Sequence, residues 1–164
     1  MRHIKPLFLF FFIACAGLIS ACSGETPLDK AILGTWVQDV PFSITTRGVQ
    51  TTTTDTVLRL KKNGETHLTR NLKIRGQDLP ESGVGVSVEL RGIWELVDGQ
   101  LRQTPDTVLI LPRDDNEATR QLADKLQEQA EKSVHSTKII VAADKSQLIL
   151  QDIETGTTDV YSRK

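Results

Sequence analysis

Residues 84–97, Val-Gly-Val-Ser-Val-Glu-Leu-Arg-Gly-Ile-Trp-Glu-Leu-Val, show the clearest periodicity in the chain. Ser87, Glu89, Arg91 and Glu95 alternate with apolar residues of the opposite parity, namely Val84, Val86, Val88, Leu90, Trp94 and Leu96. This alternation predicts a strand with one wet and one buried face. Gly92 interrupts the apolar row, and we expect a bend or bulge there, as in a sheet that curls.

Similar alternating runs, separated by short turn signals, continue on both sides of this stretch. They predict eight strands, at residues 34–42, 49–61, 65–75, 84–97, 100–111, 137–143, 147–153 and 157–163. The predicted fold is mainly β, an eight-stranded antiparallel up-and-down barrel. In such a barrel the last strand pairs with the first, which leaves no open edge.

The turn residues fix the register of two hairpins. A three-residue loop, Lys62 to Gly64 with Gly64 left-handed, keeps apolar residues on one face. It pairs Leu58 with Leu68, Thr54 with Leu72, and Thr52 with Ile74. At Asp98–Gly99 a two-residue turn instead pairs Leu96 with Leu101.

One α-helix is predicted at residues 114–134, between the fifth and sixth strands. Asp114 and Glu117 have the spacing of a capping box. A narrow apolar stripe recurs every fourth residue, at Ala118, Leu122, Leu126, Ala130 and Val134. Two interpretations stay open: a solvated helix packed on the sheet rim by this stripe, or a lid or docking face for a partner.

The first 21 residues have the composition of an export signal. Arg2, His3 and Lys5 precede an apolar run at residues 7–18. The segment Leu18-Ile19-Ser20-Ala21-Cys22 resembles the bacterial lipobox. That resemblance implies cleavage before Cys22, acyl chains such as palmitate on it, and, from Ser23, the outer membrane of a Gram-negative cell. The alternative is an ordinary signal cut after Ala21 that leaves Cys22 unmodified.

Residues 22–30 are then a lipidated tether, and residues 31–164 form one barrel domain, a size that suits a single core. Removal of Arg2 and Lys5 with the signal leaves 18 basic and 21 acidic side chains, and Cys22 is the only remaining thiol. Few aromatic rings remain, so the composition argues against nucleic acid as a partner.

The chain shows no metal, cofactor or catalytic motif. His67 and His135 lack the spacing of metal ligands. Ser87 follows Gly85 but lacks the second glycine of a nucleophile elbow, because Glu89 stands at that position. We therefore expect a protein that is not an enzyme and that binds no cofactor.

Three short motifs resemble those of the lipocalin group and of small lipocalin-like bacterial lipoproteins. They are Leu33-Gly34-Thr35-Trp36, Gly92-Ile93-Trp94-Glu95-Leu96 and Asp159-Val160-Tyr161-Ser162-Arg163. The resemblance implies that Trp36 closes one end of the barrel beneath Arg163, in a cation–π contact, and gives Gly34 and Trp94 structural roles. The helix lies elsewhere than in lipocalins, so a flattened or partly open barrel is an alternative.

Connection lengths distinguish the two ends of the predicted barrel. The second, fourth and sixth connections, at Lys62 to Gly64, Asp98–Gly99 and Asp144 to Ser146, are tight and share one end. The other three, which include the helix, are long. We expect the tight end to be closed and to carry Trp36, Arg163 and the tether, and the other end to form a mouth.

Arg70 departs from the pattern because it shares the inward parity of Leu68 and Leu72, opposite Thr56. An unpaired guanidinium in an apolar interior is costly, so Arg70 must reach water, an acid or an anionic ligand. One interpretation is that it extends to the rim. The other is that Arg70 anchors the head of an amphiphile, with a ligand site formed by Arg70, Thr56, Leu58, Leu68, Val86 and Val88.

These features predict a lipocalin-like lipoprotein, anchored on the periplasmic face of the outer membrane, that binds a small apolar or amphiphilic ligand. The membrane is its partner through the acyl chains on Cys22. The alternative is a non-enzymatic envelope protein, an accessory or inhibitor subunit, that binds another envelope protein.

Overall fold

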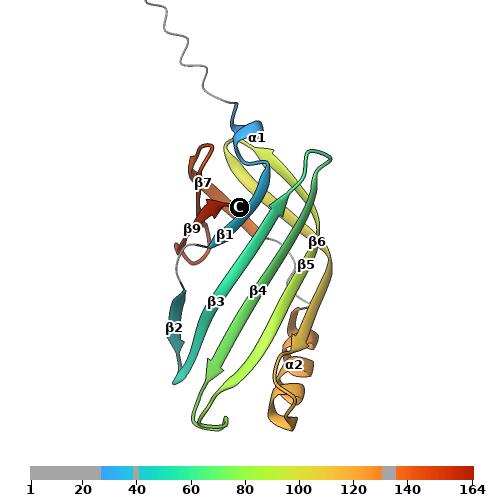
Figure 1. The fold of residues 1–164 in the computed structure, drawn as a ribbon, viewed down its shortest axis with the longest axis vertical. Coiled ribbons are helices and arrows are strands. Elements are labelled where there is room, and N and C mark those ends of the chain that lie inside the picture. Colours follow the sequence, from blue (N-terminus) through green and yellow to red (C-terminus); the bar gives the residue numbers. More distant parts are fainter. Residues whose placement is uncertain (1–26, 39–40, 131–135) are drawn as a thin grey trace, which may run out of the picture.

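The strands form one antiparallel sheet that closes on itself, in a computed structural model that describes residues 27–38, 41–130 and 136–164 (Figure 1). The elements, in chain order, are α1 (Leu28–Ala31), β1 (Gly34–Gln38), β2 (Phe42–Thr46), β3 (Val49–Leu60), β4 (Glu65–Arg75), β5 (Val84–Val97), β6 (Gln100–Pro112), α2 (Glu117–Ala130), β7 (Ser136–Ala143), β8 (Gln147–Asp152) and β9 (Thr158–Arg163).

Closure comes from β1, which pairs with both β9 and β3. Eight strands, β1 and β3 to β9, therefore form a closed antiparallel barrel, as predicted. The predicted strand 34–42 is divided into β1 and β2, and β2 pairs with β3 alone. As a consequence α2 follows the sixth strand of the chain, and its predicted place between strands five and six is wrong.

The hairpin registers confirm the predictions from the turns, except beyond a bulge. Leu58 lies opposite Leu68, and Leu96 lies opposite Leu101. Beyond a shift between Thr53 and Asp55, however, Thr53 and not Thr54 faces Leu72, and Thr51 and not Thr52 faces Ile74. The bulge inserts one residue that the sequence pattern does not mark.

Gly92 lies where β5 and β6 change register, which confirms the expected irregularity. A Cβ atom at this position would overlap the Thr104 carbonyl oxygen and the Cα of Pro105. Glycine is therefore needed because the neighbouring backbone of β6 approaches so closely.

The closed end is formed around Trp36, which is fully buried. The Arg163 guanidinium carbon lies 4.2 Å from the centre of the Trp36 ring, which confirms the predicted cation–π contact. Arg163 also donates hydrogen bonds to the carbonyl oxygens of Leu33 and Ala31, so α1 is fixed across this end. Trp94 packs against the same core and donates its indole N–H to the carbonyl of Lys61.

Gly34 joins α1 to β1 with φ of +138°, a backbone conformation that L side chains rarely adopt. A Cβ at Gly34 would lie 2.5 Å from Nη1 of Arg163. Glycine at this position thus leaves room for the guanidinium above Trp36.

At the opposite end β3 to β6 extend beyond the C-terminal strands, and α2 lies beside β5 and β6 (Figure 1). The helix begins at Glu117, and Asn116 caps it by accepting the Thr119 N–H. The predicted cap at Asp114 is wrong, because that carboxylate accepts the Gly85 N–H from β5. Residues 131–134 of the predicted helix, and His135, lie outside the described residues.

The stripe on α2 packs against the inner face of the sheet, as the packed-helix interpretation expects. From the stripe, Ala118, Leu122 and Leu126 contact a second apolar cluster that consists of Ile74, Val84, Val86 and the helix's own Ala123. The helix therefore covers part of the inner face at the end that the sequence predicts as the mouth.

Candidate functional site

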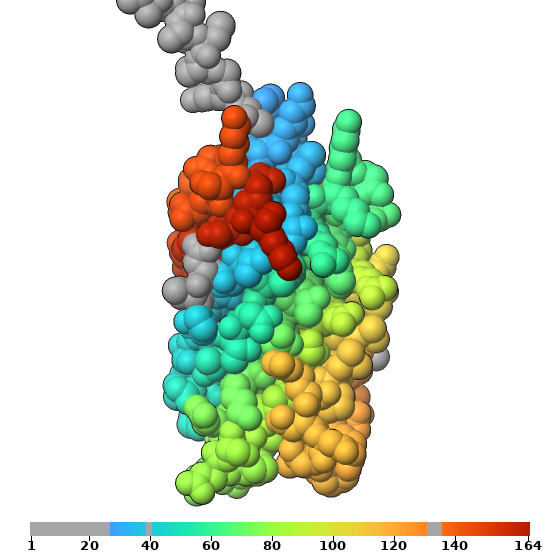
Figure 2. Space-filling view, in the orientation of Figure 1, coloured from blue at the N-terminus to red at the C-terminus, as the bar shows by residue number. Residues whose placement is uncertain are grey.

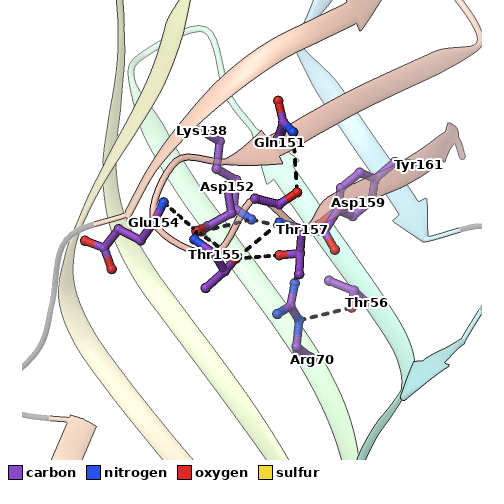
Figure 3. A network of polar contacts seen from close by, with 11 residues as sticks. Thr56, Arg70, Lys138, Gln151, Asp152, Glu154, Thr155, Thr157, Asp159 and Tyr161 are labelled. Carbon is purple, nitrogen blue, oxygen red and sulfur yellow. Dashed lines mark hydrogen bonds and ion pairs between the residues drawn. The ribbon is translucent and has the colours of Figure 1, made fainter. Parts of the chain in front are cut away.

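A network of polar side chains from β3, β4, β7, β8 and β9 lies next to Tyr161 of the closed-end core (Figure 3). Arg70 on β4 lies opposite Thr56 on β3, which confirms the predicted pair. Its Nε atom donates to the Thr56 hydroxyl at 3.3 Å, and its Nη2 atom lies 3.5 Å from Oδ2 of Asp159. An inward arginine is expected to reach water, an acid or an anionic ligand. The structure shows that Arg70 contacts an acid, Asp159 of β9.

Asp159 is the centre of this network, and its residue is only 4% exposed. The same Oδ2 atom accepts a hydrogen bond from Nζ of Lys138 at 2.9 Å and one from the Tyr161 hydroxyl at 3.4 Å. Lys138 also lies 3.9 Å from Asp152. Two cations thus face two carboxylates, which is the pairing that buried charges require.

Tyr161 stays in its neutral form within this network. Burial raises the pKa of its phenol far above the ordinary value, and the nearby charge of Asp159 raises it further. The phenol consequently acts as a hydrogen-bond donor to Asp159 at any physiological pH.

Asp152 is held in its ionised form by the turn between β8 and β9. Its Oδ1 atom accepts hydrogen bonds from the backbone N–H groups of Glu154 and Thr155 and from the Thr155 hydroxyl (Figure 3). These bonds, led by that of the Thr155 N–H, lower the pKa of the Asp152 carboxyl. The turn therefore keeps a fixed negative charge near Lys138.

Several apolar side chains around the polar network face inward and are only partly buried, although Leu90 packs against the closed-end core and Leu72 and Ile110 pack against the cluster under α2. Val88 lies between Arg70 and Ile110 in the sheet, and Leu90 lies beside Val108 in the next row. We call these residues the inner apolar surface: Leu72, Val88, Leu90, Val108 and Ile110. The Arg70 side chain, 25% exposed, borders this surface.

The predicted ligand residues divide into two groups. Arg70 and Val88 lie together at the half-exposed surface, with buried Thr56 behind Arg70. Leu58 and Leu68 instead pack in the closed-end core with Trp36, and Val86 is fully buried under α2. The structure thus does not bring these three residues to the surface that borders Arg70.

The sequence prediction missed Asp159, Lys138 and Tyr161. A usable signal was present, because Asp159 and Tyr161 share the parity of Arg163, which the barrel-closure argument already placed against Trp36. In a similar way, Lys138 shares the parity of Ile140, which packs against the closed-end core. Strand parity alone indicated that their side chains point inward.

Other candidate chemistry is sparse in the part of the chain that the structure describes. No three His, Cys, Asp or Glu side chains gather there as metal ligands would. His67 lies on β4, where burial, followed by the charge of Arg91, lowers its pKa. Two surface hollows of about 320 and about 780 Å³ lie outside the barrel, and both are lined by Ala31, Asp144 and Lys145.

None of the helices in residues 27–38, 41–130 and 136–164 has the length and apolar character needed to cross a membrane. Compared with known proteins, the chain matches no protein-family model and shows no significant similarity to a curated protein.

Proposed function

We propose that this protein is an outer-membrane lipoprotein, lipocalin-like and anchored through acyl chains on Cys22, that binds a small apolar or amphiphilic ligand. In this proposal it faces the periplasm and has no catalytic role. The anchor is supported by the order of basic, apolar and small residues before Cys22. The described fold is compatible with it, because α1 lies at the closed end, where the tether joins the domain.

The inner apolar surface is the observation that carries the ligand-binding proposal. Side chains that point toward the axis of a barrel are usually packed, as Leu148 and Leu150 are on the opposite wall. Val88 and Val108 face the same interior but are only partly buried. Covering apolar area is favourable by roughly 25 cal/mol per Å², so an apolar ligand would be stabilised there.

Arg70 suggests that the ligand has an anionic head. A guanidinium offers five N–H donors, and the contacts with Thr56 and Asp159 use two of them. A carboxylate at the edge of the inner apolar surface would accept from the remaining donors while its chain lies along Val88 and Ile110.

Fluorescence titration with a dansylated fatty acid tests this function. Val108→Asp places a charge on the inner apolar surface, and we expect at least about tenfold weaker binding. The matched control is Leu109→Asp, the next residue of β6, which points outward, is 40% exposed and should leave binding unchanged. The methyl ester of the probe should bind more weakly than the acid; equal weakening by both variants, or no binding at all, would refute the proposal.

The second candidate function is an envelope accessory or inhibitor protein. Leu109 and Leu111 favour it, because both are exposed on the outer side of β6, at 40% and 44%. Native mass spectrometry of the extracted lipoprotein separates the two candidates. A bound amphiphile that is lost in Arg70→Glu supports ligand binding, whereas an empty barrel in a complex that Leu109→Asp disrupts supports the accessory role.

A further inference from the structure

The outer side of four neighbouring strands, β1, β7, β8 and β9, lacks charged side chains in the described residues. Successive side chains of a strand point to opposite faces of the sheet. Because Trp36, Leu148, Leu150 and Tyr161 are fully buried inside the barrel, the residues that alternate with them point outward. We call the outward set the uncharged face: Thr35, Val37, Thr137, Ile139, Val141, Ala142, Gln147, Ile149, Gln151, Thr158, Val160 and Ser162.

The charges of these strands point into the barrel instead. Lys138, Asp152 and Asp159 form the interior ion cluster described above. The outer side of β4 and β5 has the usual arrangement, with Arg91 and Glu89 paired at 3.6 Å near His67. The lack of charge is therefore specific to one side of the barrel and is not a general feature of its strands.

Apolar side chains are prominent on and beside the uncharged face. Val141 is 56% exposed and Ile139 is 41% exposed, and Ile153, directly after β8, is 46% exposed. Val160 lies directly opposite Ile149 in the sheet. Depletion of charge around exposed apolar side chains is typical of the centre of a protein interface.

We propose that the uncharged face is a dimer interface, with a second copy of this chain as its partner. A twofold axis places the same surface on both subunits, so any net charge would face a like charge. This face carries none, and covering its apolar side chains is favourable, while its Thr, Ser and Gln side chains can hydrogen-bond to the same groups of the second copy. Arg59 on β3, Arg102 on β6 and Lys164, directly after β9, are exposed at the edges of this face and form a basic rim.

The position of the tether is compatible with such a dimer, and this step rests on the proposed lipid anchor. β1 and β9 lie side by side at the closed end, next to α1 (Figure 2). The uncharged face is therefore on the side of the barrel. A twofold axis along the barrel would leave both closed ends directed at the same membrane.

The size of the face sets the expected affinity. Four strands about 4.8 Å apart and about six residues long at 3.3 Å each cover a patch roughly 20 Å on a side. That is below the roughly 800 Å² per partner of a standard stable interface. We therefore expect a weak dimer in solution, with a dissociation constant in the micromolar range or above.

Sedimentation equilibrium on residues 22–164, with Ser in place of Cys22, tests the proposal, because the fold is complete within residues 27–164. Between about 10 µM and about 1 mM we expect a monomer–dimer equilibrium. Val141→Lys should weaken dimerisation at least tenfold. Its control is Ile93→Lys, which changes a side chain of similar exposure, 60%, outside the uncharged face and should have no effect.

A disulfide crosslink gives a second readout in the same protein. Val160→Cys should form an intermolecular disulfide under mild oxidation, whereas Ile93→Cys should not. A monomer throughout the concentration range, or a dimer insensitive to Val141→Lys, would overturn the proposal, as would a different protein that binds this face while the chain stays monomeric. Neither lipidation nor ligand enters this experiment, so its failure is distinguishable from failure of the proposed function.

Discussion

At the scale of single residues, Trp36 determines how well the closed end is packed. Its ring is fully buried beneath Arg163, and its indole N–H donates to the Ile32 carbonyl at 2.7 Å. We expect Trp36→Ala to lower the free energy of unfolding by about 3 to 5 kcal/mol, because it leaves a large cavity. Urea denaturation measures this loss. Trp94→Ala, at a partly buried position, should cost less, and a Trp36→Ala loss below about 1 kcal/mol would contradict the assigned role.

Asp152 links the stability of the barrel to acid. Its folded-state pKa is lowered by hydrogen bonds from the turn, first that of the Thr155 N–H. A lowered carboxyl pKa stabilises the fold above the unfolded value of about 3.9, and this contribution is lost as pH falls through the folded pKa. We expect stability to fall below about pH 4, and Asp152→Asn to flatten that dependence in pH-resolved denaturation. Thr155→Ala, which removes one donor, should give an intermediate slope, whereas an unchanged slope in Asp152→Asn would exclude this role.

At the scale of elements, α2 protects the one sheet edge that β7 leaves open. Among the described residues, pairing between β6 and β7 covers only Gln100–Gln103 of β6. Farther along, the Gln127 amide accepts the Ile110 N–H at 2.8 Å and donates to the Val108 carbonyl at 2.9 Å, as a neighbouring strand would. We expect Gln127→Ala to cost about 1 to 2 kcal/mol and to promote aggregation through this edge.

Gln121→Ala is the matched control for that change. Gln121 lies on the same helix but is exposed and bonds only Glu117 within the described residues. Chemical denaturation and light scattering on the two variants measure stability and aggregation. Equal behaviour of the two variants would show that the Gln127 amide does not protect the edge.

The elements also show which parts of the fold could be predicted from local sequence. Turn residues such as Gly64 and the pair Asp98–Gly99 determined the register, because a left-handed glycine and a two-residue turn allow few alternatives. The division of the first predicted strand had a local signal that the prediction did not use, Pro41, which cannot donate a hydrogen bond to a sheet, whereas the bulge at Thr54 had none. Arg70 could be recognised as inward-facing, but its partner Asp159 lies across the barrel, and which residues meet there depends on the stagger of all the strands.

At the scale of the whole molecule, the barrel consists of a closed half and an open half that should differ in local stability. Around Trp36, β1 is bonded on both sides, and Leu58, Leu148 and Tyr161 fill the interior. At the other end β2 pairs with β3 alone, and α2 covers only part of the inner face. Opening of the second half breaks fewer backbone hydrogen bonds and exposes less buried surface, so it requires less free energy.

Hydrogen–deuterium exchange measured by mass spectrometry should resolve these two halves. We expect peptides from β1, β8 and β9 to exchange slowest, because their amides open only when the whole barrel unfolds. Peptides from β2 and from residues 104–112 of β6 should exchange faster, through local opening at the two edges. A fatty-acid ligand bound on the inner apolar surface should slow exchange in β5 and β6 and leave β8 unchanged. Protection of β2 equal to that of β1 would mean that the two halves open together, and ligand entry would then require unfolding of the closed end as well.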